Sequence, residues 1–283
     1  MPTDTPQISR AIRSACPLCD TDSSTPFAHL DHRSIVKCRS CALLYANAYD
    51  LDQLEADYRK DYYRSADDPR IQKWIDMNAR VWLGLVEDVR RAREPVTKLL
   101  DIGAGTGGFL EAFHKASPQT SLAAVESSPE ARENLRNRLP DFQFPVDTAD
   151  AIADIDETYE VITLLQTLEH VFDPLTVCRQ IHDLLTPGGV FLVTVPNRYS
   201  YRVLRRGTSD TWCFSNSTHL QFFSRATLPH MLRLAGFKQV RRIKRFGGSE
   251  HTGLRAVAQY ALRQLALSTE LRFVALKQDG APA

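Results

Sequence analysis

The chain has 283 residues, of which 43% are hydrophobic and 24% charged, the ordinary balance of a globular protein. This length has room for one large domain and a small additional module. A net charge of +1 excludes a global basic field that would draw the whole molecule to nucleic acid or an anionic membrane. The sequence has no apolar run long enough to span a bilayer and no apolar signal core at its start, so we expect a cytoplasmic protein.

The first 48 residues divide into a tail and a cysteine-rich module. Residues 1–13 are rich in Pro, Thr and Ser without apolar periodicity, and we expect a disordered tail. Residues 14–48 contain two Cys-x-x-Cys pairs, each able to present two thiolates to one tetrahedral Zn²⁺ ion. Four protein ligands leave no open position, so the ion would be structural; a redox pair or incidental cysteines are the alternatives. The expected ligands are Cys16, Cys19, Cys38 and Cys41.

After residue 48, the spacing of apolar residues predicts first helices and then an alternation of strands and helices. Residues 49–95 favour a connector of two charged helices, the second with an apolar stripe at helical spacing. Over residues 96–283, apolar strands alternate with helices, which predicts a doubly wound parallel sheet with right-handed crossovers. Strands are expected at residues 98–102, 121–125, 142–146, 159–165, 190–195, 238–245 and 271–277.

The segment 99–110 runs from a strand through a glycine-rich turn into a helix. Gly103, Gly105 and Gly107 let the backbone turn tightly and approach a ligand, and the amide groups at the helix start face the same space. The loop satisfies both G-x-G-x-G and G-x-G-x-x-G, so a dinucleotide-binding fold is equally permitted. Glu126, at the end of the second strand, suits either ligand because a carboxylate there can accept both ribose hydroxyls.

Other residues break this tie. Asp101 could hold the ammonium of a methionine moiety, and Asp147, after the third strand, could accept a hydrogen bond from an adenine amine. Two further segments are LLQTLEHVFDP, which ends at residue 174, and LLTPGGVFLVTVPN at residues 184–197. With these motifs the sequence resembles class I S-adenosylmethionine (SAM)-dependent methyltransferases over about residues 98–277. That family typically shows a D-x-G-x-G-x-G loop, an acid about twenty residues on, an LEH segment and an L-x-P-G-G turn.

The resemblance implies a Rossmann-like sheet of seven strands, doubly wound with the last strand antiparallel, behind a small zinc-ribbon-like module. It implies SAM as the cofactor, with the glycine loop on its methionine part. Glu126 would bind the ribose and Asp147 the adenine, and Gln166 would line the pocket behind the sulfonium. The loop residues concerned are Asp101, Gly103, Ala104, Gly105 and Gly107.

The stretch from Cys16 to Tyr63 resembles the N-terminal part of bacterial methyltransferases encoded with polysaccharide and secondary-metabolite pathways. Sugar C-methyltransferases also carry a zinc module before the same fold, although their tyrosine and histidine motifs are not clearly reproduced here.

Methyl transfer to a hydroxyl or an enol needs an aligned nucleophile and a base. His219, in a segment that resembles the family's HLxxFS motif, is the best-placed base, and an equal alternative is that it bonds the backbone to fix the base of a lid. Glu169 and His170 either approach a metal or substrate or cap the following turn, and we favour capping.

Residues 198–218 fit neither strand nor helix and are interpreted as an inserted lid. Arginines with aromatic residues suit a phosphorylated or nucleotide-linked acceptor, because guanidinium groups match phosphate oxygens. A solvated basic loop is the simpler alternative. The residues concerned are Arg198, Tyr199, Tyr201, Arg202, Arg205, Arg206 and Trp212.

Three functions compete. A SAM-dependent methyltransferase acting on a small molecule, such as a sugar, nucleotide-sugar or natural-product intermediate, leads. An RNA methyltransferase that grips RNA through the zinc module is disfavoured by the near-zero net charge. A non-catalytic zinc adaptor with a retained SAM fold is disfavoured because the cofactor motifs are intact. We therefore expect a small-molecule partner, no nucleic acid and no membrane insertion; the sequence leaves the oligomeric state open.

Overall fold

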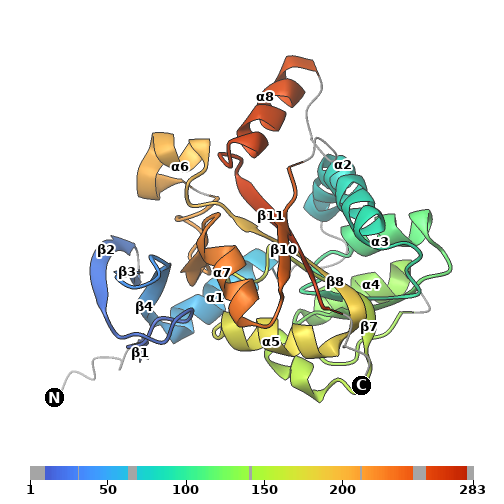
Figure 1. Ribbon diagram of the computed structural model, residues 1–283, viewed down its shortest axis with the longest axis horizontal. Helices are drawn as coiled ribbons and strands as arrows, with labels where there is room; N and C mark the ends of the chain where they lie inside the picture. The colour runs from blue at the N-terminus through green and yellow to red at the C-terminus, as the bar shows by residue number, and fades with distance from the viewer. Residues whose placement is uncertain are drawn as a thin grey trace.

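The computed structural model describes residues 10–30, 32–62, 69–139, 142–210, 212–244 and 253–278. Two sheets organise this part of the chain, an antiparallel sheet near the N-terminus and a larger, mostly parallel one (Figure 1). None of the helices in the described ranges is both long enough and apolar enough to cross a membrane.

The N-terminal sheet has the strand order β1-β4-β3-β2, and β9, from much later in the chain, pairs with β4. Its strands are β1 (Arg10–Ile12), β2 (Ser24–Leu30), β3 (Arg33–Cys38), β4 (Leu44–Asp50) and β9 (Gln221–Phe222). The disorder predicted for residues 10–12 is wrong, because β4 offers an open edge and backbone pairing needs no apolar pattern. Residues 1–9 of the predicted tail lie outside the described residues.

The larger sheet has the strand order β10-β11-β8-β7-β5-β6. Pairs among β5 to β8 are parallel, whereas β11 is antiparallel to both of its neighbours. This confirms the predicted doubly wound sheet with an antiparallel last strand. The strands are β5 (Lys98–Ile102), β6 (Ser121–Val125), β7 (Tyr159–Leu165), β8 (Leu185–Pro196), β10 (Gln239–Arg242) and β11 (Glu270–Leu276).

The strand predicted at residues 142–146 is reduced to a single bridge from Gln143 to Ala123 of β6. The sheet therefore has six strands in the described chain rather than seven. Pro145 explains the difference, because proline lacks the amide hydrogen and cannot extend a ladder. Phe142 and Phe144 still pack against the core, so the segment keeps its expected place at the sheet edge.

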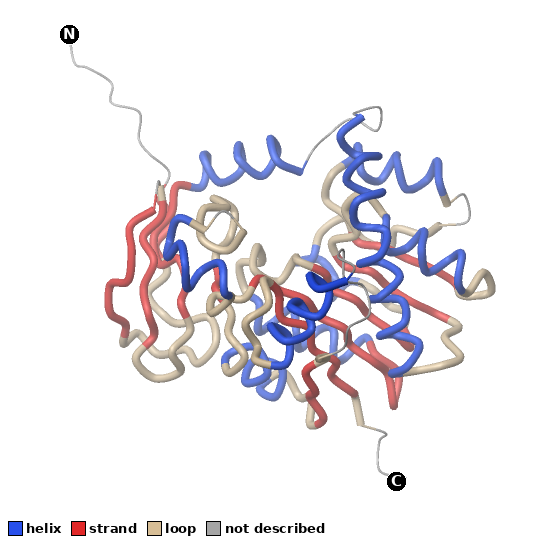
Figure 2. The backbone as a smooth tube through the Cα atoms, turned by 90° about the horizontal axis from the view of Figure 1, so that it is seen from above, coloured by secondary structure: helices blue, strands red, loops and turns tan. Residues whose placement is uncertain are grey.

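Helices cover both faces of the larger sheet, as Figures 1 and 2 show. Side chains alternate along β5, so Leu99 joins one buried cluster while Leu100 and Ile102 join the other. The cluster with Leu99 also contains residues of α2 (Pro69–Ala92), α3 (Gly108–Ala116) and α4 (Pro129–Arg138). The cluster with Leu100 and Ile102 contains residues of α5 (Pro174–Leu184) and α7 (Thr227–Leu234). The remaining α-helices are α1 (Leu51–Tyr62), α6 (Tyr201–Arg206) and α8 (Gly253–Gln264).

The N-terminal sheet shares its core with the larger sheet. Leu18, Val36 and Leu43 belong to the same buried cluster as residues of α5 and α7. The fully buried Arg33 donates to the carbonyl oxygens of Phe214 (3.0 Å) and His219 (2.5 Å). Residues after β8 are therefore fixed between the two sheets.

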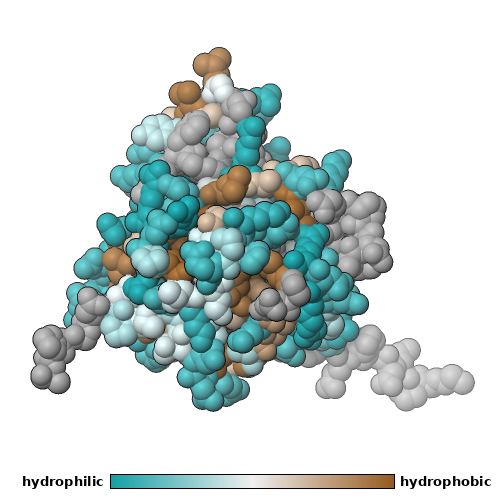
Figure 3. Space-filling model, turned by 90° about the vertical axis from the view of Figure 1, so that its right-hand side faces the viewer, coloured by the Kyte–Doolittle hydropathy of each residue, from teal (hydrophilic) through white to brown (hydrophobic). Residues whose placement is uncertain are grey.

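The surface is mainly hydrophilic on the face that Figure 3 shows, with apolar residues at its top and in small patches across its middle. α8 projects at the top of the molecule in Figure 1, and it exposes Leu254 and Val257.

Candidate functional site

The glycine loop between β5 and α3 forms an open cradle at the carboxyl end of the parallel strands. Gly103, Gly105 and Gly107 have φ angles of 74°, 55° and 77°, the left-handed region that favours glycine. A Cβ at Gly105 would meet no atom within 4 Å, so this backbone faces open space. Gly107 is the N-cap of α3 and supplies no side-chain cap, which suits the first amide groups of α3 to a ligand.

Two buried carboxyl groups lie beside this cradle. Glu126 accepts hydrogen bonds from the amides of Gly105 (2.6 Å) and Ser128 (2.8 Å). Asp101 accepts one from the hydroxyl of Thr163 (2.6 Å). Burial raises the pKa of both, that of Asp101 to about 7, and the hydrogen bonds oppose this rise. Such acids can bind an ammonium group or ligand hydroxyls and would gain a partner for their charge.

Gln166 and Asp147 lie at different depths. Gln166 has a φ of 54°, and its side-chain amide donates to the hydroxyl of Thr194 (3.1 Å) at the adjacent end of β8. The next residue, Thr167, closes on the loop, because a Cβ at Gly103 would lie 2.3 Å from its hydroxyl. Asp147 has a side chain that is 67% exposed and paired with Arg132 of α4, at the rim.

Three threonines that the sequence motifs did not indicate organise this edge. Thr163 holds Asp101, Thr167 packs on the glycine loop, and Thr194 holds Gln166. Thr163 and Thr194 are polar residues inside otherwise apolar strands, a signal that was available in the sequence.

The four N-terminal cysteines converge as their spacing predicts. Their sulfur atoms all lie within 4.8 Å of one another, with 3.5 Å between Cys16 and Cys41 and between Cys19 and Cys38. Sulfurs at about 2.3 Å from one tetrahedral ion would be about 3.8 Å apart, whereas a disulfide needs about 2.05 Å. The hydrogen bond between Cys16 and Cys41 lowers the pKa of Cys16 to about 5 and raises that of Cys41, so one sulfur of this pair is favoured as the thiolate that binds metal. The donor set fits a zinc ion.

Asp20 and Ala42 stand at the positions where such cysteine knuckles often have glycine. Both residues have positive φ angles, 56° and 62°, so the chain makes the same turn without glycine. Their amides donate to the carbonyls of Cys16 and Cys38, which gives both knuckles the same fold.

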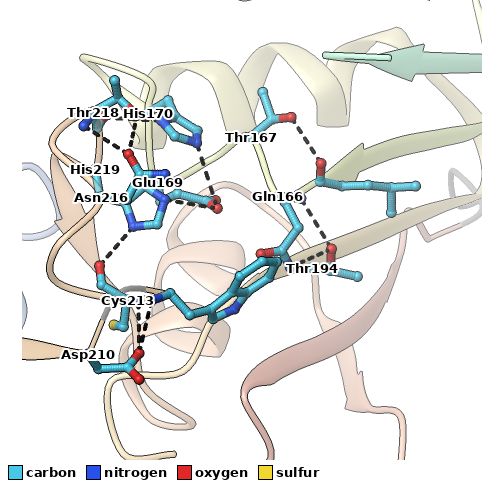
Figure 4. Close-up of polar contacts among 12 residues, drawn as sticks. Gln166, Thr167, Glu169, His170, Thr194, Asp210, Cys213, Asn216, Thr218 and His219 are labelled. Atoms are coloured by element: carbon cyan, nitrogen blue, oxygen red, sulfur yellow. Dashed lines mark hydrogen bonds and ion pairs between the residues drawn. The ribbon is translucent and has the colours of Figure 1, made fainter. Parts of the chain in front are cut away.

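His219 meets Glu169 and His170 in a cluster at the carboxyl end of β7, where Glu169 and His219 are buried and His170 is half-buried (Figure 4). The Nδ1 of His219 lies 2.8 Å from the carbonyl of Cys213, and its Nε2 lies 3.9 Å from Glu169 Oε1. The capping role favoured for Glu169 and His170 is wrong: α5 is capped by Asp173. His170 instead contacts the carbonyl of Thr218 at 3.1 Å through Nδ1, because the chain after β8 folds back over β7.

The arginine-rich segment 198–218 is partly built into the fold. Its first turn is α6, and Arg202 of that helix pairs with the fully buried Asp210 (3.1 Å). Arg198 is buried, stacks on the ring of Tyr199 and donates to its hydroxyl. Arg205, by contrast, is exposed.

Comparison with known proteins identifies the family. A family model described as a methyltransferase domain matches residues 73–241, more than half of the chain. The chain belongs to the methyltransferase domain family. This confirms the resemblance to class I SAM-dependent methyltransferases, and the match contains the whole cradle, from the glycine loop to the carboxyl end of β8.

Individual relatives agree with this assignment. The chain is 31% identical over 153 residues to a ubiquinone biosynthesis O-methyltransferase of Ruegeria pomeroyi, covering 51% of this chain and 61% of the relative. It is 29% identical to a trans-aconitate 2-methyltransferase of Rhodopseudomonas palustris, covering 50% and 51%. The chain thus spans about half to six-tenths of the length of these two curated relatives.

A solved structure supports the fold. The plantazolicin methyltransferase BpumL, in complex with S-adenosylhomocysteine (SAH), superposes with a TM-score of 0.51 at 16% identity. The match covers 80% of this chain and 98% of that protein.

Proposed function

We propose that this chain transfers a methyl group from SAM to a small-molecule acceptor. The observation that carries the proposal is the cradle: Glu126 on the amide of Gly105, Asp101 beside it, and an α3 start without a side-chain cap. Family membership and the SAH bound to the BpumL neighbour favour SAM over NAD. Calorimetry with SAH and NAD on the purified chain tests this, and binding of NAD without SAH would overturn it.

The cofactor contacts follow from this arrangement. Asp101, Gly103, Ala104, Gly105 and Gly107 would hold the methionine part, and Glu126 would accept the ribose hydroxyls. Gln166 would line the pocket behind the sulfonium. Asp147 would accept a hydrogen bond from the adenine amine at the rim of the cradle. Its carboxylate would then either bind Arg132 and the amine together or give up its ion pair with Arg132.

Bound SAM would supply a methyl group on a sulfonium, a leaving group that needs no acid. The chain must then hold the acceptor in line and remove its proton. We propose His219 for the acceptor side: a carbonyl oxygen only accepts, so its Nδ1 donates to Cys213 and its Nε2 can receive a proton. The two curated relatives are named for small molecules, which supports an acceptor of that class, such as a sugar, nucleotide-sugar or natural-product intermediate.

We further propose that residues 14–48 form a structural zinc module, residues 49–95 a connector and residues 96–283 the catalytic domain. The module would shape the acceptor pocket together with the lid at residues 198–218. β9 follows this lid directly and pairs with β4, and Arg33 of β3 donates to the carbonyls of Phe214 and His219. Zinc bound at the cysteines would therefore order the strands that carry the acceptor side.

A further inference from the structure

Three potential metal ligands converge outside the cofactor cradle. The Nε2 atoms of His170 and His219 each lie 3.9 Å from Glu169 Oε1, and one ligand atom from each residue falls within 4.8 Å of the others. These distances are too long for hydrogen bonds. They suit atoms that share an ion, since ligands at about 2.0–2.2 Å from one metal are about 3–4 Å apart.

A backbone carbonyl facing Nδ1 fixes the orientation of each imidazole ring. His170 Nδ1 faces the carbonyl of Thr218 (3.1 Å) and His219 Nδ1 faces that of Cys213 (2.8 Å). Because carbonyl oxygens only accept, both Nδ1 atoms donate, and the lone pair of each ring lies on Nε2, directed at Glu169 (Figure 4). Metal-binding histidines characteristically donate the other ring N–H to a carbonyl or carboxylate in this way.

Glu169 completes the set with a buried carboxyl group. It is 1% exposed, and among the described residues its Oε2 has no hydrogen-bond partner. A buried carboxyl oxygen without a protein partner, beside two imidazole nitrogens, leaves a position for a cation.

We infer that Glu169, His170 and His219 bind one divalent transition-metal ion through a carboxylate oxygen and two Nε2 atoms. Two imidazoles and one carboxylate favour Zn²⁺, Mn²⁺ or Fe²⁺ over Mg²⁺ and Ca²⁺. Three protein ligands leave at least one position open, so this site differs from the closed cysteine site. The N-terminal module fixes the backbone of His219: Arg33 donates to its carbonyl, and β9, which begins two residues later, pairs with β4.

The catalytic consequence rests on the proposed function. Glu169 follows Gln166 by three residues at the same carboxyl end of β7, so an acceptor hydroxyl could bind the ion on the methyl side of SAM. The bound hydroxyl would lose its proton to solvent, and the oxygen would form the O–CH₃ bond as the S–CH₃ bond breaks and its electron pair returns to sulfur. His219 would then be a ligand rather than the base, since Nε2 cannot do both.

Metal content tests the inference without reference to activity. The full chain, with zinc retained at its cysteines, is titrated with Mn²⁺ and followed by electron paramagnetic resonance and calorimetry. We expect one Mn²⁺ site in the wild type, and at least tenfold weaker binding in Glu169→Gln and in His170→Asn. Asp183→Asn is the matched control, because Asp183 also adjoins a histidine, His182, but is exposed.

Two outcomes would overturn the inference. One is a wild type that binds neither Mn²⁺ nor a second equivalent of Zn²⁺; the other is a folded Glu169→Gln variant with unchanged metal affinity. Thermal unfolding of each variant establishes whether it is folded, and SAH binding is measured separately. Metal binding without SAH binding would refute the proposed function alone, and SAH binding without metal would refute the metal site alone.

Discussion

Glu126→Ala tests the cofactor cradle most directly. Glu126 is 7% exposed, so solvent screens its charge little, and it accepts from the Gly105 amide at 2.6 Å. If the carboxylate accepts ribose hydroxyls, its removal costs about 1.5–3 kcal/mol for a charge-assisted hydrogen bond. That loss corresponds to a Kd for SAH raised about 10–150-fold.

The measurement is calorimetric titration of SAH into wild type and variant at equal pH and salt. Glu133→Ala is the control: Glu133 lies on α4, seven residues on, and is exposed, so its removal should leave the Kd unchanged. Glu126→Ala also leaves the amides of Gly105 and Ser128 without their hydrogen-bond acceptor. The midpoint temperature of thermal unfolding should therefore be lower in this variant. A folded Glu126→Ala protein with wild-type SAH affinity would refute the assignment of the ribose carboxylate.

Three more predictions address the metal, the acceptor side and pH. Combining Cys38→Ser with Cys41→Ser should lower the zinc content by one ion per chain in elemental analysis and increase hydrogen exchange in β2–β4 and β9. An unchanged zinc content would place this ion elsewhere. His219→Ala should lower kcat by roughly 10²–10⁴-fold with SAH affinity nearly unchanged, and a wild-type rate would remove it from the acceptor side. Since the pKa of Asp101 is raised from 3.8 to about 7, its stabilising contribution is complete below about pH 4 and is lost as pH rises through 7. Urea unfolding without ligand should show Asp101→Asn more stable than wild type at pH 8 and similar at pH 4, and equal stability at both would contradict the buried environment.

Local sequence determines the edge of the larger sheet that carries the glycine loop. Alternation of apolar strands and helices specified the doubly wound sheet, because a parallel strand buried on both faces needs a continuous apolar run. Gly103, Gly105 and Gly107 specified the loop, since only glycine adopts those positive φ angles without strain. Both Cys-x-x-Cys pairs specified the sulfur cluster, because each pair folds its own knuckle. Pro145 could have corrected the predicted third strand, since its missing amide is visible in the sequence.

The cluster of Glu169, His170 and His219 was decided only by tertiary structure. Glu169 and His219 are 50 residues apart in sequence, and they meet because β9 leaves the lid to pair with β4 while the amide of Leu220 bonds the carbonyl of Glu169. No periodicity encodes such a contact, so the capping role favoured for Glu169 and His170 was wrong. In the same way, the basic segment 198–218 reads as a solvated loop, yet it contains Asp210 and Cys213 at full burial. Burial against a distant strand depends on the packing of two sheets, which is a property of the folded chain and not of any local window.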